Sequence, residues 1–294
     1  MNSVLKRLKE KSILVSDGAW GTFLQEKGLK PGECPESWNI SRPEDVLEIA
    51  RSYVEAGADT ILTNSFGGSI FKLQSYGLES QCYELNKSAA EISRKAAGNT
   101  TLVLGSIGPT GKLLMMGEVS REELYESFSI QSKGLADGGA DAIIVETMSD
   151  IEEAVIAVRA AKESTGMEVI CTLTFSLTAA NEYRTMMGIG PAECIQPLLD
   201  AGADILGANC GNGTAGMIDI IKEMRKENPE VPLLVHANAG VPRLVDGKSV
   251  FPESPEEMSC QVEELISAGA NIVGGCCGTT PDHIRSIVNT LKSG

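Results

Sequence analysis

The sequence predicts an α/β protein whose residues 1–294 form a single domain, a (β/α)8 or TIM barrel. Three observations predict this fold. Short apolar runs alternate with amphipathic segments eight times, a four-residue motif recurs at every second unit, and the length fits the ~250 residues typical of such barrels. Because strand–helix alternation implies crossover connections, we expect parallel strands with helices outside them.

The predicted strands are eight short apolar runs. They are Ile13–Val15, Thr60–Thr63, Leu102–Leu104, Ala142–Val145, Val169–Leu173, Ile205–Leu206, Leu233–Val235 and Ile272–Val273. A helical pattern follows each run, at residues 43–56, 80–97, 120–138, 150–164, 191–201, 214–227, 255–268 and 281–292. Ser120 with Glu123, and Ser254 with Glu257, predict capping boxes. We expect His283, in the first turn of the last helix, to be a surface residue.

A repeated motif ends alternate helices and precedes the second, fourth, sixth and eighth strands. Its copies are Ala56-Gly57-Ala58-Asp59, Gly138-Gly139-Ala140-Asp141, Ala201-Gly202-Ala203-Asp204 and Ala268-Gly269-Ala270-Asn271. Glycine suits the left-handed end of a helix, and Asp or Asn suits the following turn. This rhythm favours a closed barrel over an open sheet with two domains.

Composition excludes some classes of partner. A net charge of −15 and a pI near 4.7 argue against nucleic acids and anionic membranes. No apolar stretch approaches the roughly 20 residues of a membrane helix, and Ile13–Val15 is too short for a signal peptide core. We therefore expect a cytoplasmic protein.

The eight cysteines divide into two groups. Five are scattered, and we expect them to be small, buried or half-buried side chains: Cys34, Cys82, Cys171, Cys194 and Cys260. The other three directly follow strands, as Cys210 and as Cys276-Cys277 in the run Gly274–Thr280. Thiols at strand ends can converge on one soft metal, and Zn²⁺ fits best. The alternative for Cys276-Cys277 is a buried pair or a redox-active vicinal disulfide.

Three cysteine ligands leave one coordination position open, which is typical of catalytic zinc sites. Three thiolates on Zn²⁺ also make the site electron-rich, so a substrate thiol that binds there loses its proton and stays nucleophilic. Hydrolytic sites prefer histidine or carboxylate ligands and a bound water. The pattern therefore favours activation of a thiol.

Two strand-end carboxylates, Asp17 and Glu146, should face the same mouth. Either can bind the ammonium group of an amino acid, and the turn Asp17–Thr22 offers backbone N–H groups to a carboxylate. The alternatives are a turn or cap role for Asp17 and a structural ion pair for Glu146.

Other residues near the mouth have weaker signals. Strand alternation places His236 on the same face as Asn238, and packing in the barrel is the favoured role for His236. Trp20 fits a lid or plain packing equally well. We expect Met115 and Met116 to pack.

The chain resembles the homocysteine S-methyltransferase family, most of all the homocysteine-binding half of cobalamin-dependent methionine synthase. The resemblance spans nearly all of Ile13 to Leu291. It rests on Asp17–Thr22, Gly108-Pro109-Thr110-Gly111, Glu146-Thr147, Asn209-Cys210, Asn238-Ala239-Gly240 and Gly274–Thr280. It implies an enzyme, a zinc-dependent homocysteine S-methyltransferase.

The resemblance also implies roles for individual residues. Zinc would be held by Cys210, Cys276 and Cys277, with the homocysteine sulfur as fourth ligand. The amino acid would be held by Asp17 and Glu146, with the backbone near Gly18 and the side chains of Thr63 and Ser106 close by. Asn238 can occupy the open zinc position when substrate is absent.

Departures from two branches of the family indicate the methyl donor. The betaine-using branch has aromatic residues where this chain has Gly67 and Thr147, and the S-methylmethionine-using branch has an arginine where it has Gly278. Neither histidine has Asp two residues before it, so the Asp-x-His motif that ligates cobalamin is absent from these residues. We therefore expect a separate corrinoid protein to deliver the methyl group of methylcobalamin. The alternatives are a free donor such as S-methylmethionine and a non-catalytic module that binds a thiol or an amino acid.

Overall fold

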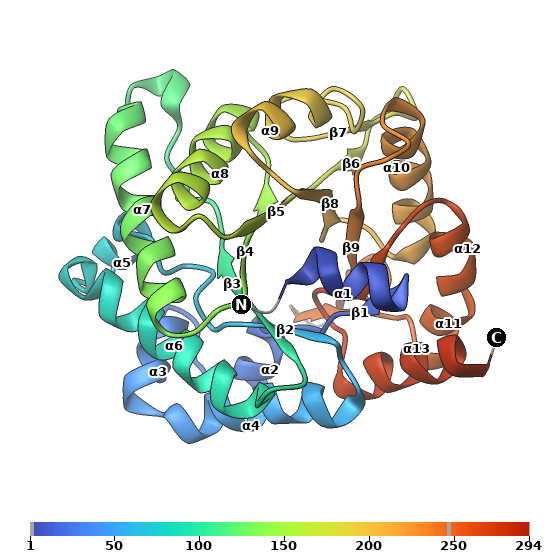
Figure 1. Ribbon diagram of the computed structural model, residues 1–294, viewed down its shortest axis with the longest axis horizontal. Helices are drawn as coiled ribbons and strands as arrows, with labels where there is room; N and C mark the ends of the chain where they lie inside the picture. Colours follow the sequence, from blue (N-terminus) through green and yellow to red (C-terminus); the bar gives the residue numbers. More distant parts are fainter. Residues whose placement is uncertain (1–2, 246–247, 294) are drawn as a thin grey trace.

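The computed structural model of the protein describes residues 3–245 and 248–293. Its central sheet has eight parallel strands: β1 (Leu14–Val15), β2 (Thr60–Leu62), β3 (Leu102–Ile107), β4 (Ala142–Met148), β5 (Glu168–Leu173), β8 (Ile205–Asn209), β9 (Leu233–Ala237) and β12 (Ile272–Gly275). They are ordered β1-β12-β9-β8-β5-β4-β3-β2, and a parallel bridge between Ser16 and Thr60 joins the two ends of this order. The sheet thus closes into a barrel, which confirms the predicted fold (Figure 1).

The barrel helices lie outside the sheet and connect consecutive strands, except for α13, which follows the last strand. They are α4 (Pro43–Ala56), α6 (Cys82–Ala97), α7 (Arg121–Asp137), α8 (Ile151–Thr165), α9 (Ile195–Ala201), α10 (Thr214–Glu227), α11 (Pro255–Cys260), α12 (Val262–Ser267) and α13 (Pro281–Ser293). The predicted capping boxes begin α7 and α11. The single helix predicted over residues 255–268 is wrong, because Gln261 separates α11 from α12.

Strand alternation sorts the apolar side chains into two cores. One core fills the barrel: Val4, Leu14, Leu62, Leu102, Leu104, Ala142, Ile144, Ile170, Ile205, Leu234 and Ile272. Their neighbours along the strands, such as Val103 and Val235, pack instead against the outer helices. Val4 belongs to α1 (Val4–Lys11), a helix that the sequence reasoning missed, and it is fully buried under the barrel floor (Figure 1).

The repeated motif has one structural task in all four copies. The side chain of its last residue accepts a hydrogen bond from the backbone N–H of the preceding strand, in the pairs Asp59–Val15, Asp141–Val103, Asp204–Val169 and Asn271–Leu233, at 2.8–3.0 Å. The same side chain binds a basic residue from the helix before that strand: Lys11, Arg94, Lys162 and Arg225, respectively. These contacts tie neighbouring strands together at the α1 end of the barrel.

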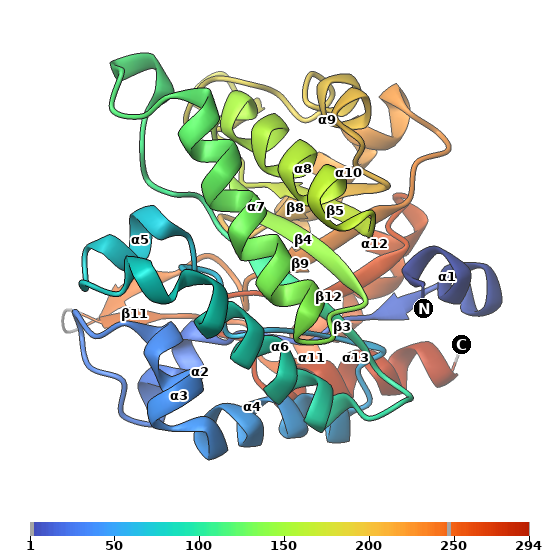
Figure 2. The ribbon, with the colours of Figure 1, turned by 60° about the vertical axis from the view of Figure 1, so that its left-hand side comes forward.

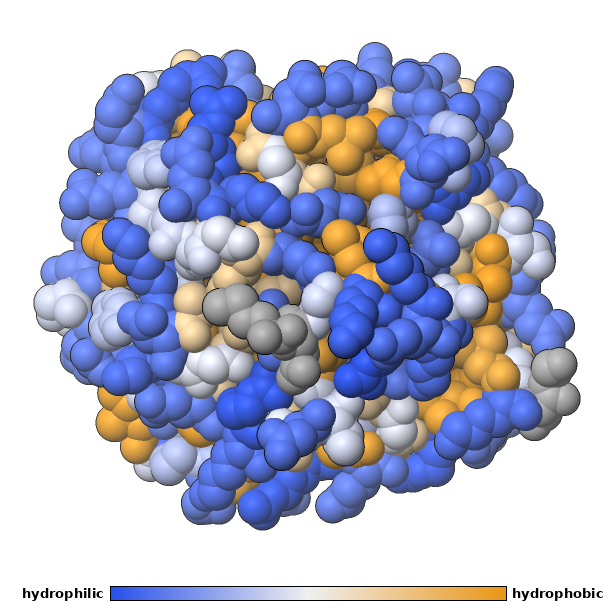
Figure 3. All heavy atoms as spheres, viewed as in Figure 1, coloured by the Kyte–Doolittle hydropathy of each residue, from blue (hydrophilic) through white to orange (hydrophobic). Residues whose placement is uncertain are grey.

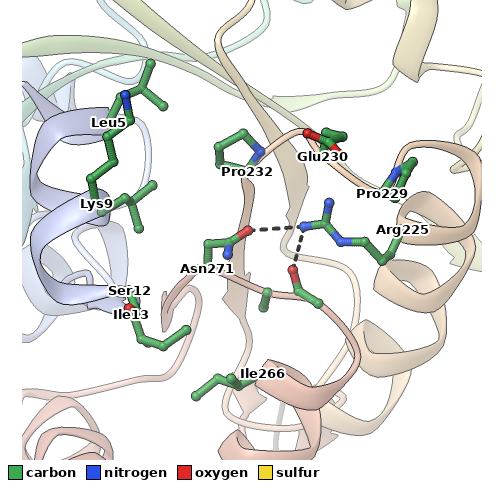
Figure 4. Close-up of a pocket in the computed structure, with 13 residues that line it drawn as sticks. Leu5, Lys9, Ser12, Ile13, Arg225, Pro229, Glu230, Pro232, Ile266 and Asn271 are labelled. Carbon is green, nitrogen blue, oxygen red and sulfur yellow. Dashed lines mark hydrogen bonds between the residues drawn. The ribbon is translucent and has the colours of Figure 1, made fainter.

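A cavity of about 520 Å³ lies at this α1 end between α1 and the segments around α10 and α12 (Figure 4). Arg225 reaches across it to the backbone oxygen of Gly269 and to the side chain of Asn271, at 2.8 and 3.1 Å. The cavity lies at the opposite end of the barrel from the cysteines. Its Arg225 guanidinium already has hydrogen-bond partners within the fold, Gly269 and Asn271.

Extra elements gather at the other end, the mouth, where the strands point. They are α2 (Gly21–Glu26), η1 (Pro35–Ser37), α3 (Trp38–Ser41), α5 (Ile70–Gln74), η2 (Glu79–Gln81), η3 (Leu114–Met116) and two hairpins, β6 (Ser176–Leu177) with β7 (Tyr183–Arg184) and β10 (Arg243–Val245) with β11 (Lys248–Val250). In Figure 2, α2, α5 and β11 lie at the left, opposite α1 at the right. Among the described residues, no helix combines the length and the apolar composition that crossing a membrane would require.

Four of the five scattered cysteines are buried as expected: Cys34, Cys82, Cys171 and Cys194. The fifth expectation is wrong, because Cys260 is exposed at the end of α11. Cys260 lies on the solvent side of α11, a short helix that the sequence predicted as part of one longer helix.

Candidate active site

Three half-buried thiols meet at the barrel mouth. Cys210 follows β8, and Cys276 and Cys277 follow β12, which lies two strands away in the sheet. The three sulfur atoms lie within 4.8 Å of one another, and Cys210 Sγ is 3.9 Å from Cys277 Sγ. The intervening strand β9 anchors both sides, because its His236 and Ala237 carbonyls accept from the N–H groups of Cys210 and Cys276 at 3.0 and 2.7 Å.

The backbone at Cys210 is held in a demanding conformation. Its φ is +59°, in the left-handed region that non-glycine residues rarely adopt. Such a conformation persists only where the surroundings fix it, and it is typical of functional sites. Here it turns the Cys210 sulfur toward the vicinal pair.

The charge state of this cluster favours a cation. Hydrogen bonds from Cys276 and Cys277 hold the pKa of Cys210 far below its ordinary value, because they stabilise its thiolate. The pKa values of Cys276 and Cys277 are raised, since Cys276 must donate a hydrogen bond to that thiolate, as must Cys277. By themselves the three thiols therefore support one negative charge, and ionising all three requires a positive ion among them.

An unpaired oxygen lies beside the thiols. The side chain of Asn238 contacts Cys210, yet its Oδ1 is buried and has no hydrogen-bond partner among the described residues. A buried acceptor without a partner is costly, and a metal ion or a ligand would satisfy it. Three thiol sulfurs match the soft donor set that suits zinc, and such an oxygen can fill the fourth position.

Asp17 is fully buried at the end of β1. Its Oδ2 accepts from the N–H of Leu62 at 2.7 Å and from Trp20 Nε1 at 2.8 Å, whereas its Oδ1 has only Ser16 Oγ at 3.3 Å. Burial raises the pKa of Asp17 to about 7, and the hydrogen bonds offset this only in part. Trp20 is thus a hydrogen-bond partner of Asp17. The sequence had suggested only a lid or plain packing for this residue.

Glu146 is the second buried carboxyl group. It is 8% exposed, and its Oε1 accepts from Ser106 Oγ at 2.5 Å. Burial raises its pKa to about 7, and the negative charges of Asp17 and Cys210 add to the shift. That coupling places both carboxyl groups and the thiols in one electrostatic environment.

A β-bulge aims Glu146. The register between β4 and β5 shifts between Val145 and Met148, and Thr147 adopts a φ of +62°. The side chain of Asn209 clamps this irregular segment: its Oδ1 accepts from Thr147 N at 2.8 Å, and its Nδ2 donates to Thr147 Oγ1 at 2.7 Å. Asn209, which precedes Cys210, therefore fixes the position of Thr147, which follows Glu146.

The remaining predicted residues lie around these groups. Thr63 Oγ1 accepts from the N–H of Ser106 at 2.9 Å and is buried. At Gly18 a Cβ atom would lie only 2.7 Å from Thr279 Oγ1, so no other residue fits there. The structure thus brings all nine predicted site residues to the mouth or directly beneath it.

Two predictions about other residues are wrong. Met115 and Met116 are 72% and 67% exposed, because the loop after β3 carries them outward. His283 is only 6% exposed and is bonded on both ring nitrogens. His236 is buried in the barrel as favoured; burial lowers its pKa to about 4, and its Nε2 has no partner among the described residues.

Sequence reasoning also missed Thr279 and Tyr53. Thr279 Oγ1 donates to the Cys276 carbonyl at 2.7 Å and accepts from Ala19 N at 3.1 Å, so it joins the cysteine turn to the Asp17 turn. Tyr53 donates to the Ala19 carbonyl at 2.7 Å from α4. The threonine beside the double cysteine was a visible signal, whereas nothing in the local sequence pointed to the tyrosine.

The chain is similar in sequence to known proteins. The family model "Homocysteine S-methyltransferase" matches residues 14–291. Methionine synthase from Mycobacterium leprae is 33% identical over 292 residues, and the match covers 94% of this chain and 24% of that protein. Methionine synthase from Mycobacterium tuberculosis is 32% identical, with 96% of this chain and 25% of that protein covered. The chain therefore spans about a quarter of the length of these relatives.

A solved structure gives the same fold. The homocysteine methyltransferase MmuM from Escherichia coli, in its metallated form, is 24% identical and superposes with a TM-score of 0.79, covering 97% of this chain and 99% of that one.

Proposed function

This chain belongs to the homocysteine S-methyltransferase family, and from that premise we propose that it transfers a methyl group to the thiolate sulfur of homocysteine to give methionine. The observation that carries the proposal is the meeting of three sulfurs, within 4.8 Å of one another, with two buried carboxyl groups at one barrel mouth. A metal-held thiol and an amino-acid head group need those two kinds of binding group side by side.

We assign the metal site to Cys210, Cys276 and Cys277. When bound, zinc would lower the pKa of a substrate thiol and keep its sulfur nucleophilic at neutral pH. The chain itself supplies the three sulfurs and the unpaired oxygen of Asn238, which a ligand sulfur can displace.

Asp17 and Glu146 are assigned to the ammonium group of homocysteine. Each is buried with a raised pKa, so an incoming cation favours its ionised form and gains a charge-assisted hydrogen bond. Ser106 and Trp20 hold the two carboxyl groups in place. The carboxylate of homocysteine would then meet the backbone N–H groups of the turn that begins at Gly18.

The methyl group is proposed to come from a corrinoid carried by a separate protein. The observation that favours this donor is the distribution of exposed apolar side chains. Among the residues that the structure describes, those that are large and exposed all lie in connections between a strand and its barrel helix, on the mouth side: Ile40, Phe66, Tyr76, Met115, Met116, Leu177, Met186, Val241, Leu244 and Val250. The opposite face, which α1 covers, is largely hydrophilic but also shows hydrophobic patches (Figure 3).

An apolar rim of this kind suits a macromolecular donor. A small donor diffuses into the mouth and requires no exposed apolar surface around it, whereas exposed apolar surface is typical of sites where proteins dock. Gly278 adds to the argument. Its φ is +81° and the ring of Phe251 lies where its Cβ would be, so the turn has no room for a donor-binding side chain at this position.

A donor screen separates the proposed function from its alternatives. Purified zinc-loaded protein is incubated with homocysteine and either methylcobalamin or S-methylmethionine, and methionine is measured. We expect methionine with methylcobalamin, and none from the Cys277→Ser variant. Methionine from S-methylmethionine alone would establish the free-donor alternative, and homocysteine binding without methionine from either donor would establish a non-catalytic module.

A further inference from the structure

His283 is one of two histidines in the chain and is buried one turn into α13. Its Nδ1 is 3.1 Å from the backbone nitrogen of Thr280, and its Nε2 is 3.0 Å from the carbonyl oxygen of Glu253. Because a backbone N–H can only donate, Nδ1 must accept and carries no proton. The ring proton therefore lies on Nε2, which donates to Glu253.

These two bonds belong to a closed circuit around the cysteine turn. Glu253 N donates to the Ala239 carbonyl at 3.0 Å, and Ala239 N donates to the Cys277 carbonyl at 3.0 Å. From Cys277 the chain returns to Thr280 after three residues. We call this set, Cys277, Ala239, Glu253, His283 and Thr280, the His283 circuit.

The circuit holds both ends of the loop that follows Asn238 and contains the β10–β11 hairpin. Ala239 and Glu253 are the two ends of that loop, and both are attached to the cysteine turn through the circuit. The segments that carry Cys277 and the Asn238 oxygen are therefore joined through Glu253.

A histidine at position 283 indicates that the hydrogen bond to the Glu253 carbonyl matters as well as the bond to Thr280. Helices α7 and α11 begin with a capping box in which Glu123 or Glu257 accepts from the N–H of the serine three residues earlier. His283 makes the same contact to Thr280 from the same position. Glutamate would serve that task alone, but only a side chain with an additional donor can also bind the Glu253 carbonyl.

We propose that His283 is a positioning residue, which fixes Cys277 and Asn238 for metal binding by donating to Glu253 and so joining Glu253 and Ala239 to the cysteine turn. This inference rests on the proposed function, because it assumes that the thiols hold zinc. Outer partners of metal sites typically contribute about 10–100-fold to metal affinity. We expect a loss in that range when the bond to Glu253 is removed.

Two substitutions separate this role from simple helix capping. His283→Glu restores the capping box to Thr280 but places an acceptor against the Glu253 carbonyl. His283→Gln keeps an amide N–H at the position of Nε2. Zinc affinity is measured on the full chain by competition with a chromophoric chelator, and the thermal midpoint of the metal-free protein reports on the cap.

We expect His283→Glu to keep the thermal midpoint of the parent yet bind zinc about 10–100-fold more weakly, with His283→Gln binding more tightly than His283→Glu. The negative charge that His283→Glu adds would by itself favour binding of the cation, so charge does not explain a loss of zinc affinity in this variant. Parent-like zinc affinity in His283→Glu would overturn the inference and leave the proposed function standing. Cys277→Ser is the reference: if the parent binds zinc no better than this variant, the proposed function fails as well.

Discussion

At the α1 end of the barrel, four strands begin with the same contact, whereas at the mouth the side chains that follow the strands share no such repeated contact. The repeated Asp or Asn binds the neighbouring strand and a basic residue each time. At the mouth the pKa values of Asp17, Glu146 and Cys276 are raised, and Cys210 has a positive φ angle. The difference indicates that the first end stabilises the barrel and the second carries its chemistry.

The largest effect should come from the thiols. Cys277→Ser replaces a soft sulfur by a hard oxygen, so zinc affinity should fall by more than the ~100-fold seen for outer partners. Chelator competition measures this loss, and the thermal midpoint of the metal-free protein should stay near the parent's. Cys260→Ser is the matched control, because this exposed thiol lies outside the cluster. Equal zinc loss in both variants would contradict the assignment.

The next largest effect concerns the amino-acid head group. Glu146→Gln keeps the shape and the contact with Ser106 but removes the charge, so homocysteine affinity should fall about 10–100-fold, the equivalent of one charged hydrogen bond. Calorimetric titration of the zinc-loaded protein measures it. Zinc affinity should not change, and Glu152→Gln, at an exposed ion pair on α8, should bind homocysteine as the parent does. A variant that lost zinc instead would assign Glu146 to the metal site.

A substitution at the α1 end of the barrel should lower the stability of the protein and leave its ligand affinities unchanged. Asp141→Ala leaves the Val103 N–H and the Arg94 guanidinium without their shared partner, which should lower the free energy of unfolding by about 1–3 kcal/mol. Denaturant unfolding checks this, with Asp137→Ala, at the exposed contact to Tyr83, as the control expected within about 0.5 kcal/mol of the parent. Zinc and homocysteine affinities should be unchanged in the folded variant. If ligand affinity fell while stability held, the two ends would not be separate in function.

The smallest effect is a dependence on pH. The pKa values of Asp17 and Glu146 are raised from 3.8 and 4.5 to about 7, so in the free protein both carboxyl groups are largely neutral below that pH. Their contribution to stability is complete below the ordinary pKa values and is lost as the pH rises through about 7. An ammonium ligand binds their ionised forms, so its affinity should rise over the same range.

Methionine is the suitable probe, because it has no thiol that titrates. Its affinity should increase about tenfold between roughly pH 6 and pH 8, and the Asp17→Asn/Glu146→Gln double variant should show a flat profile. A profile that stays steep in the double variant would locate the titrating group elsewhere.

The same comparison shows what a sequence can predict. The eight strands and the end motifs follow from periodicity and glycine placement, which are local properties. Residue parity along the strands also brings Ser106 and Glu146 to the barrel interior above the apolar layer of Leu104 and Ile144. The meeting of Cys210 with Cys276 and Cys277 needed only the barrel register, because parallel strands end at one mouth.

The missed features depend on contacts between distant segments. His283 is buried by Glu253, 30 residues earlier, and no local pattern reports that contact. The hairpins β6–β7 and β10–β11 have strands of two or three residues, too short for a period-two signal. The bulge at Glu146 arises from an extra residue in β4 relative to β5, a register that neither strand specifies alone.

The central claim is that three cysteine sulfurs hold one zinc ion and leave a position for the sulfur of homocysteine. X-ray absorption at the zinc edge, recorded on the purified protein with and without homocysteine, tests it most directly. The account predicts three sulfurs and one lighter atom around zinc in the free protein, and four sulfurs at about 2.3 Å once homocysteine is added. A protein that retains no zinc, or a sulfur count that homocysteine leaves unchanged, would contradict it.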